Sequence, residues 1–279
     1  MNEFILTDSD FRSISALLEK AAGINLSPSK KTLVYSRLVK RLRLAGTTTF
    51  AEYRTLLERD STERQKMVEA LTTNTTSFYR ERHHFDHLKD LLINQLIPAA
   101  RQGRRVRIWS AACSTGEEPY SIAFTVLSVL PQGSGDLDLK ILATDINSTV
   151  VEKARTGIYG SSAIETLPPG TRQRFFEKVT GSNGVEVAVC RAARDLISFR
   201  TLNLQEAWPM NGAFDVIFCR NVMIYFSPET QSRLWQRFGS VMPQGGILYI
   251  GHSERVTGPA AQSLINIAPT TYMLSGEGK

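Results

Sequence analysis

The sequence predicts an α/β fold: a mostly parallel sheet with an antiparallel last strand, a small all-helical domain before it, and a small antiparallel β insertion within it. Three observations carry this prediction. Apolar side chains recur at helical spacing in the first seventy residues, apolar strand runs alternate with helical patterns after residue 105, and the alternation is interrupted between residues 160 and 203. With 279 residues and 42% hydrophobic side chains, the chain has room for one large and one small domain.

Residues 1–70 are predicted to form the helical domain. Apolar residues at helical spacing indicate a first amphipathic helix around residues 11–18. A second helix is expected to open at Ser27 and Pro28, an N-cap and first-turn pair, and to end near Gly46. Two shorter helical patterns follow, at residues 51–59 and 62–72.

Residues 71–279 are predicted to form the α/β domain. Apolar runs typical of strands lie at 106–111, 139–145, 214–220, 245–254 and 270–275. Helical patterns lie at 117–130, 147–159 and 228–242. In the interruption, residues 185–190 and 195–200 look like strands without a helix between them, and a GSNG turn precedes the first. We therefore predict the antiparallel β insertion at about residues 161–200.

The strongest local signal is WSAACSTGEEPY at residues 109–120, where a buried strand passes through small residues into a helix. Small residues let the backbone approach a ligand closely, and a helix N-terminus offers unpaired N–H groups to an anion. Open α/β sheets bind ligands at this position, beyond the carboxyl ends of their strands. Glu117 is either a ligand contact there or an acidic residue that favours the helix dipole.

Asp145 ends the second strand, where a carboxylate can accept hydrogen bonds from ribose hydroxyls. The alternative is that Asp145 caps the next helix, a role that Asn147 or Ser148 can also fill. The loop after the first strand holds a single glycine, Gly116, and no G-x-G-x-x-G, which disfavours a dinucleotide. Together the two motifs indicate a nucleoside-containing cofactor without saying which one.

Four segments, in this order and spacing, resemble the chemotaxis receptor protein-glutamate O-methyltransferases, the CheR family. They are LTTNTTSFYRE (71–81), WSAACSTGEEPYSIA (109–123), FDVIFCRNVMIYF (214–226) and GGILYIGHSE (245–254). The resemblance covers nearly the whole chain, including the basic helical domain. It implies a Rossmann-like class I methyltransferase sheet that uses S-adenosyl-L-methionine and releases S-adenosyl-L-homocysteine.

The resemblance also implies the site residues. Those that match cofactor contacts are Asn74, Thr76, Arg80, Glu117, Asp145, Asn203, Leu204, Arg220 and Asn221. Glu117 matches the carboxylate that holds the methionine ammonium, and Asp145 matches the ribose acceptor. Asn203 and Leu204 match a pair that lines the adenine pocket. Arg220 and Asn221 match a contact near the methionine moiety.

By the same resemblance, Arg80 and Tyr225 act on the substrate carboxylate. That carboxylate is already ionised near neutral pH, so methyl transfer to it needs no general base. A sulfonium cation and a carboxylate anion become a neutral thioether and a neutral ester, and a dry site lowers the barrier. We therefore assign Arg80 and Tyr225 to orienting the substrate and not to proton transfer.

The formal charge of +6 predicts an acidic partner. Residues 28–50 contain six basic residues and no acid, and Arg37, Lys40 and Arg41 share one face of the expected helix. The plain interpretation is a solvated helix face. The resemblance implies that this helix docks the acidic methylation region in the cytoplasmic signalling domain of methyl-accepting chemoreceptors. Charge alone also allows nucleic acid, but no aromatic interleaving or binding module supports it, so we predict no nucleic-acid partner.

The other candidate sites are weaker. His83 and His87 lie one helical turn apart, but no further ligand is placed nearby, so we predict a surface cluster and no metal. Cys113 and Cys219 are expected to pack in the core and not to act as nucleophiles. The β insertion offers an edge that can accept a peptide as an added strand, and in some members of the family it binds the receptor C-terminal peptide. The loop at residues 181–184 leaves that question open.

The chain shows neither a signal peptide nor an apolar stretch of about 18 residues, and its three cysteines are widely spaced. We therefore expect a cytoplasmic monomer with reduced thiols and no membrane insertion. Three other functions stay open from the residues alone: methylation of nucleic acid or a small molecule, nucleotide-dependent oxidoreduction, and a non-catalytic adaptor that binds the cofactor as a signal.

Overall fold

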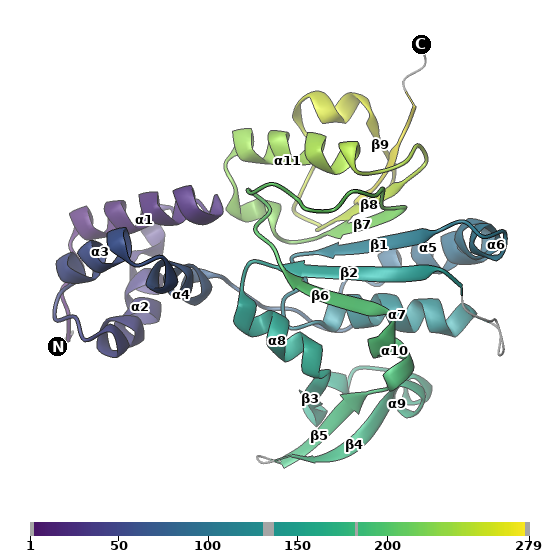
Figure 1. Cartoon of the computed structure of the whole chain (residues 1–279), viewed down its shortest axis with the longest axis horizontal. Helices are drawn as coiled ribbons and strands as arrows, with labels where there is room; N and C mark the ends of the chain where they lie inside the picture. Colours follow the sequence, from purple (N-terminus) through teal and green to yellow (C-terminus); the bar gives the residue numbers. More distant parts are fainter. Residues whose placement is uncertain (1–2, 131–136, 182–183, 277–279) are drawn as a thin grey trace.

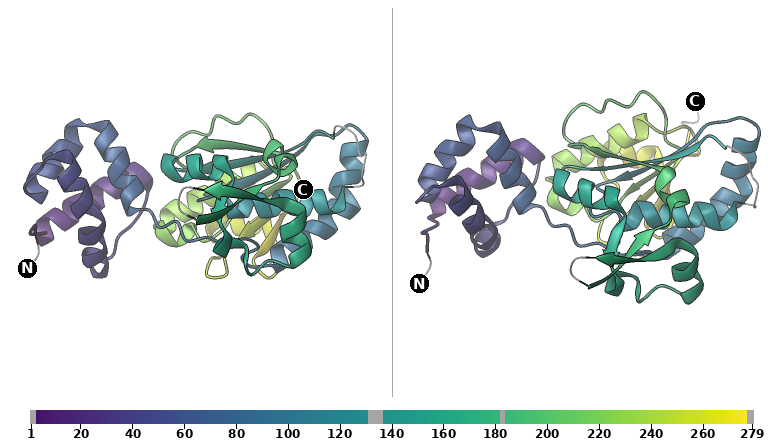
Figure 2. Two further views of the ribbon diagram at one scale, coloured as in Figure 1. Left: turned by 90° about the horizontal axis from the view of Figure 1, so that it is seen from below. Right: turned by 60° about the horizontal axis from the view of Figure 1, so that its bottom comes forward.

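A computed structural model describes residues 3–130, 137–181 and 184–276. A bundle of helices at the N-terminus stands beside the sheet domain (Figures 1 and 2). Its helices are α1 (Asp8–Ala22), α2 (Lys31–Ala45), α3 (Phe50–Arg59) and α4 (Ser61–Leu71). Ile14, Leu38 and Tyr53 are fully buried in its core. The prediction of a helical N-terminal domain is confirmed.

The second helix begins differently from the prediction. A 3-10 turn, Pro28–Lys30, precedes α2, and among the described residues the Ser27 hydroxyl bonds to Ser29 Oγ at 2.8 Å instead of to a backbone N–H. The predicted end at Gly46 is confirmed. Gly46 adopts a φ of 68°, in the left-handed region that glycine occupies without strain.

The main sheet has the order β6-β2-β1-β7-β8-β10-β9. Its strands are β1 (Val106–Ala111), β2 (Leu139–Asp145), β6 (Ile197–Thr201), β7 (Val216–Cys219), β8 (Ile247–Ile250), β9 (Leu264–Ala268) and β10 (Thr271–Leu274). Neighbouring strands pair in parallel from β6 to β8, whereas β10 is antiparallel to both β8 and β9. The predicted sheet with an antiparallel last strand is confirmed, but the edge strand β9 was not predicted.

Helices cover the sheet on both faces (Figure 1). They are α5 (His83–Leu91), α6 (Ile97–Arg101), α7 (Glu117–Val129), α8 (Ser148–Thr156), α10 (Arg191–Asp195) and α11 (Pro228–Ser240). The helix α9 (Pro169–Phe175) lies instead beside the small antiparallel insertion (Figure 1). Successive strand residues point to opposite faces. In β1, Ile108 belongs to the core formed with α5 and α7, whereas Trp109 belongs to the core formed with α11. This double burial explains why the strands are apolar throughout.

The prediction for the insertion is wrong at both ends. The helix expected at residues 147–159 ends at Thr156, and the insertion begins with a strand at Ile158–Gly160 instead of at about residue 161. A separate antiparallel sheet contains β3 (Ile158–Gly160), β5 (Gly184–Val189) and β4 (Phe176–Gly181), in that order. Residues 195–200, expected in this insertion, lead instead into β6, which pairs in parallel with β2. The helix α10 returns the chain to the main sheet, and its five residues are too few to show a helical period. Residues 182 and 183 of the loop left open above lie outside the described residues.

The predicted surface cluster of His83 and His87 is confirmed for His83, which is exposed, but His87 is half-buried. His84 is fully buried, and its Nε2 lies 2.7 Å from Thr270 Oγ1. His87 Nδ1 lies 2.7 Å from the hydroxyl of Tyr249 on β8. These side chains connect α5 to the sheet, and among the described residues no group of three or more His, Cys, Asp and Glu is arranged to hold a metal ion.

Cys113 and Cys219 are buried in the two cores, as predicted, and burial raises the pKa of both thiols.

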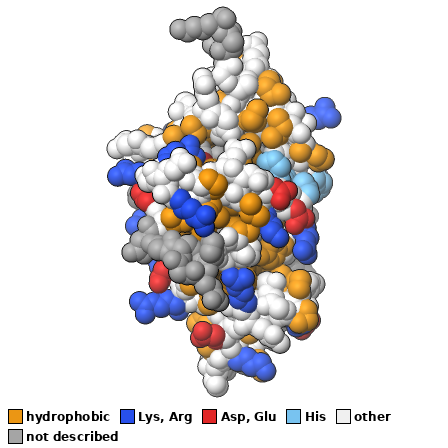
Figure 3. All heavy atoms as spheres, turned by 90° about the vertical axis from the view of Figure 1, so that its right-hand side faces the viewer, with side chains coloured by type: hydrophobic (Ala, Val, Ile, Leu, Met, Phe, Trp, Pro, Cys, Tyr) orange, Lys and Arg blue, Asp and Glu red, His pale blue; other side chains and the backbone are white. Residues whose placement is uncertain are grey.

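Lys and Arg side chains are spread over the face turned away from the helical bundle, between hydrophobic side chains (Figure 3). In the part of the chain that the structure describes, no helix has the length and apolar character needed to cross a membrane.

Candidate active site

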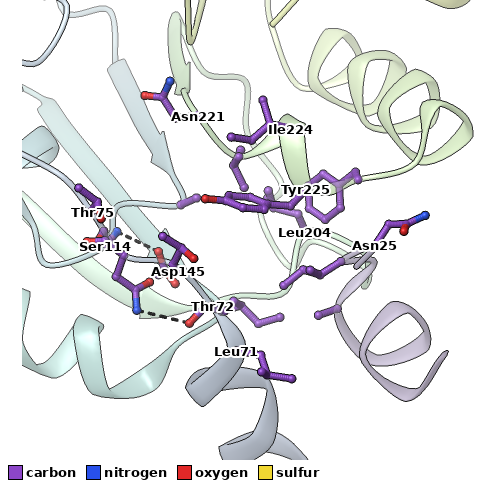
Figure 4. Close-up of a pocket in the computed structure, with 18 of the residues that line it drawn as sticks. Asn25, Leu71, Thr72, Thr75, Ser114, Asp145, Leu204, Asn221, Ile224 and Tyr225 are labelled. Atoms are coloured by element: carbon purple, nitrogen blue, oxygen red, sulfur yellow. Dashed lines mark hydrogen bonds between the residues drawn. The ribbon is translucent and has the colours of Figure 1, made fainter. Parts of the chain in front are cut away.

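A cavity of about 760 Å³ lies between the helical bundle and the carboxyl ends of β1, β2 and β7 (Figure 4). Both domains contribute to its wall. From the bundle come Ala22, Ile24, Lys30 and Arg37, among others. The sheet domain contributes the loop after β1, Asp145, and the segment that follows β7 as far as Pro228. The position is the one that the sequence predicts for a ligand.

The loop after β1 turns sharply toward the cavity. Ala112, Ser114 and Gly116 all have positive φ, of 69°, 50° and 98°. A Cβ on Gly116 would lie 2.8 Å from Ala154 Cβ and from the Tyr159 hydroxyl, so only glycine fits there. The glycine is therefore needed for packing of the loop against α8 and β3.

Asp145 lies at the tip of β2, where it is 6% exposed. Its Oδ2 accepts from the Ser114 N–H at 2.8 Å (Figure 4). Its Oδ1 accepts from the Asn147 N–H at 2.9 Å. Burial raises the pKa of Asp145, and these backbone N–H groups oppose the shift. The alternative of a helix cap is excluded, because Asn147 Oδ1 accepts from Thr149 and Val150 and caps α8.

The segment that joins the two domains forms another wall. Asn74, Thr76 and Arg80 all line the cavity. The Ser114 hydroxyl donates to the Asn74 carbonyl at 2.8 Å, which ties this segment to the loop after β1. Arg80 Nη1 donates to the Thr75 carbonyl at 3.2 Å, and its side chain is partly exposed.

Arg220 follows β7 and is buried, with its side chain 2% exposed. Its Nη1 lies 2.9 Å from Glu118 Oε2 and its Nη2 lies 3.3 Å from Glu81 Oε2. Among the described residues, Arg220 Nε has no hydrogen-bond partner. A buried donor without a partner is costly, so this guanidinium in the cavity wall suits an anionic ligand group.

Glu118 lines the cavity, whereas Glu117, the residue predicted for the methionine ammonium, is not among the described lining residues. Glu117 accepts from the Thr115 hydroxyl at 2.7 Å at the start of α7. Glu118 Oε1 accepts from the Ser110 hydroxyl at 2.7 Å, and burial raises the pKa of Glu118 against the effect of Arg220. The sequence analysis missed Glu118, because the buried ion pair with Arg220 that turns this side chain toward the cavity is seen only in the structure.

Direct contacts between the two domains form the last wall of the cavity. Asn203 Nδ2 donates to the Ala21 carbonyl at 2.8 Å, and the Asn25 N–H donates to the Tyr225 carbonyl at 2.8 Å. An isolated antiparallel bridge pairs Ile24 with Phe226. These contacts bring Leu204, Asn221 and Tyr225 to the same cavity as Asp145 (Figure 4).

The match to protein-family models follows the same division of the chain. Residues 9–72 match a model described as the all-alpha domain of CheR methyltransferases, and residues 74–273 match a model described as their SAM binding domain.

The chain belongs to the CheR methyltransferase family.

Similar proteins extend over most of the chain. A "Probable chemotaxis protein methyltransferase" of Rhizobium etli is 49% identical over 92% of this chain and 96% of its own. The "Chemotaxis protein methyltransferase 2" of Pseudomonas aeruginosa is 46% identical over 97% of this chain and 94% of its own. The "Chemotaxis protein methyltransferase" of Escherichia coli is 44% identical over 89% of this chain and 85% of its own.

In this CheR methyltransferase, the basic residues of α2 differ in their contacts and in their exposure. Arg37 lines the cavity, and its Nη1 donates to the carbonyls of Leu71 and Thr72 at 2.8 and 2.6 Å. Arg41 donates to both carboxylate oxygens of Glu63, at 3.0 and 2.6 Å. Lys40 is exposed. Two of the three residues predicted for receptor docking therefore make contacts within the chain, and the docking role stays a prediction.

Proposed function

We propose that this CheR methyltransferase transfers a methyl group from S-adenosyl-L-methionine to glutamate side chains in the cytoplasmic signalling domain of methyl-accepting chemoreceptors. The observation that carries the proposal is one cavity that brings Asp145 together with Arg220, Glu118 and Arg80. The chemotaxis methyltransferases that the chain resembles support the choice of substrate class. Since the substrate region is cytoplasmic, the proposal also places the chain in the cytoplasm.

The cavity residues fit the two ends of that cofactor. Asp145 has lone pairs left to accept from ribose hydroxyls, because each of its oxygens accepts one bond from the backbone at 2.8 to 2.9 Å. Asn203 and Leu204 are proposed to line the adenine site. At the other end, Arg220 is proposed to bind the methionine carboxylate. We propose Glu118 for the ammonium in place of Glu117, because Glu118 lies in the wall of the cavity.

When bound, the cofactor supplies a methyl group on a sulfonium cation. The chain's own task is then to hold an ionised glutamate in line with that group and to exclude water. Arg80 lies on the segment that joins the two domains and Tyr225 on the segment after β7, and both line the cavity. We propose that they orient the glutamate. Neither has to move a proton, since the substrate is already a carboxylate at neutral pH.

The test is methyl transfer from radiolabelled S-adenosyl-L-methionine to a purified receptor signalling fragment. We expect label that is released by mild base, as a methyl ester is, and that is lost when the glutamates of the fragment are replaced by alanine. Label on RNA or DNA, or base-stable label on the fragment, would contradict the proposal.

Receptor docking by α2 is best tested at Lys40, the exposed residue of the three predicted. Lys40→Glu is expected to slow methylation of the receptor fragment about 5-fold at low ionic strength, and less at high salt, because charge reversal weakens electrostatic steering. Lys66→Glu, on an exposed position of α4, is the matched control. Equal rates for the Lys40 variant and the wild type at all salt concentrations would remove Lys40 from the docking surface.

A further inference from the structure

The backbone around Arg80 is held in an unusual conformation. Tyr79 and Glu81, which flank it, both have positive φ, of 53° and 56°. Side chains with a Cβ rarely occupy this left-handed region, and they persist there only when surrounding contacts hold them. The conformation matters for the site, because the Arg80 side chain between them lines the cavity.

Contacts from the sheet domain hold this segment on both sides of Arg80. The Tyr79 N–H donates to the Ser121 hydroxyl on α7 at 2.9 Å. Arg220 Nη2 donates to the Arg80 carbonyl. The Glu81 carboxylate accepts from His252, from Nδ1 at 3.0 Å and from the N–H at 3.2 Å.

The same carboxylate helps to hold Arg220. Glu81 and Glu118 flank its guanidinium at 3.3 and 2.9 Å, and the guanidinium lies 5.7 Å from the centre of the Phe85 ring. Burial would raise the pKa of Glu81, but Arg220 and the bonds from His252 hold it at about 2, so the carboxylate is charged. Burial lowers the pKa of His84, 3.6 Å from Glu81, to about 3, so that imidazole adds no charge.

Glu81 itself is not among the described residues that line the cavity. Its links run to three residues that do line the cavity: to Arg80 through the backbone, to Arg220 through the ion pair, and to Asn221, whose Nδ2 donates to Glu81 Oε1 at 3.5 Å. We propose that Glu81 is a positioning residue, which fixes Arg80 and Arg220 in the cavity wall so that both face the methionine end of the cofactor and the acceptor glutamate. The proposal rests on the proposed function and adds a residue to it.

The test is Glu81→Gln, which keeps the size of the side chain and removes its charge. We expect S-adenosyl-L-homocysteine to bind about 10-fold more weakly in calorimetry, because Arg220 loses one of its two carboxylates. We also expect kcat for receptor methylation to fall about 10-fold, because Arg80 is no longer fixed. Glu81→Asp keeps the charge and is expected to recover part of both losses.

Asp215→Asn is the matched control. Asp215 is a buried carboxylate that pairs with Arg104 at 2.9 Å and accepts from the Arg107 N–H at 2.8 Å. It lies just before β7, at the opposite end of the strand from Arg220. This variant is expected to lower the Tm without changing affinity for S-adenosyl-L-homocysteine.

A double variant separates positioning from a merely structural role. If Glu81 acts partly through Arg80, then Glu81→Gln should lower kcat less in the Arg80→Ala background than in the wild type. Wild-type affinity and wild-type kcat in a folded Glu81→Gln variant would overturn the proposal. Absence of binding or methylation by the wild type would instead overturn the proposed function.

Discussion

Replacing Arg80 by alanine is expected to lower kcat for receptor methylation by about 100-fold, the scale of losing one preorganised electrostatic contact in an active site. The Arg80 side chain lines the cavity and makes one hydrogen bond to the residues that the structure describes, from Nη1 to the Thr75 carbonyl at 3.2 Å. The remaining N–H groups of the guanidinium are therefore available to a substrate carboxylate. Steady-state kinetics with a receptor fragment measure the effect, and the Tm is expected to stay near that of the wild type.

Arg82→Ala is the matched control for this experiment. Arg82 lies two residues further along the same segment, with its side chain 70% exposed and 3.9 Å from Asp86. Surface pairs of this kind contribute little to stability. We expect nearly wild-type activity from Arg82→Ala. Equal activity in both variants would show that Arg80 has no part in orienting the substrate.

Asp145→Ala is expected to weaken binding of S-adenosyl-L-homocysteine by about 100-fold, because hydrogen bonds to a charged group contribute about 1.5–3 kcal/mol each. Part of the loss is expected through the loop after β1, since the variant also removes the acceptor for the Ser114 N–H. Calorimetric titration measures the affinity. Asp138→Ala, before the opposite end of β2, removes a carboxylate that pairs with Arg107 at 2.6 Å and is expected to leave the affinity unchanged. Unchanged affinity in Asp145→Ala would contradict the ribose role.

The sequence predicts the central sheet well because its strands are buried on both faces. Double burial leaves continuous apolar runs, such as residues 106–111 and 139–145, that stand out between helical patterns. The two missed features lack this signal. β9 is an edge strand with Ile265 and Ile267 about 40% exposed, and α10 is too short to reveal that residues 195–200 return to the main sheet.

The sequence predicts where the site lies in the fold, but it does not show which side chains face the cavity. Asp145 follows directly from its place at the end of a strand. Glu117 and Glu118 are adjacent and identical, so only the direction of each side chain tells which of them faces the cavity, and that direction is set by the pairing of Glu118 with Arg220. In the same way, periodicity places Arg37 and Arg41 on a helix face but does not show that they bond to the Leu71 and Thr72 carbonyls and to Glu63.

The measurement that bears most directly on the whole account is a titration of the wild-type chain with S-adenosyl-L-homocysteine, with NAD as the comparison ligand. We expect saturable binding of one equivalent of the thioether nucleoside and no heat from NAD. A flat titration with S-adenosyl-L-homocysteine, from protein shown to be folded, would contradict the assignment of the cavity between the two domains as a methyl-donor site.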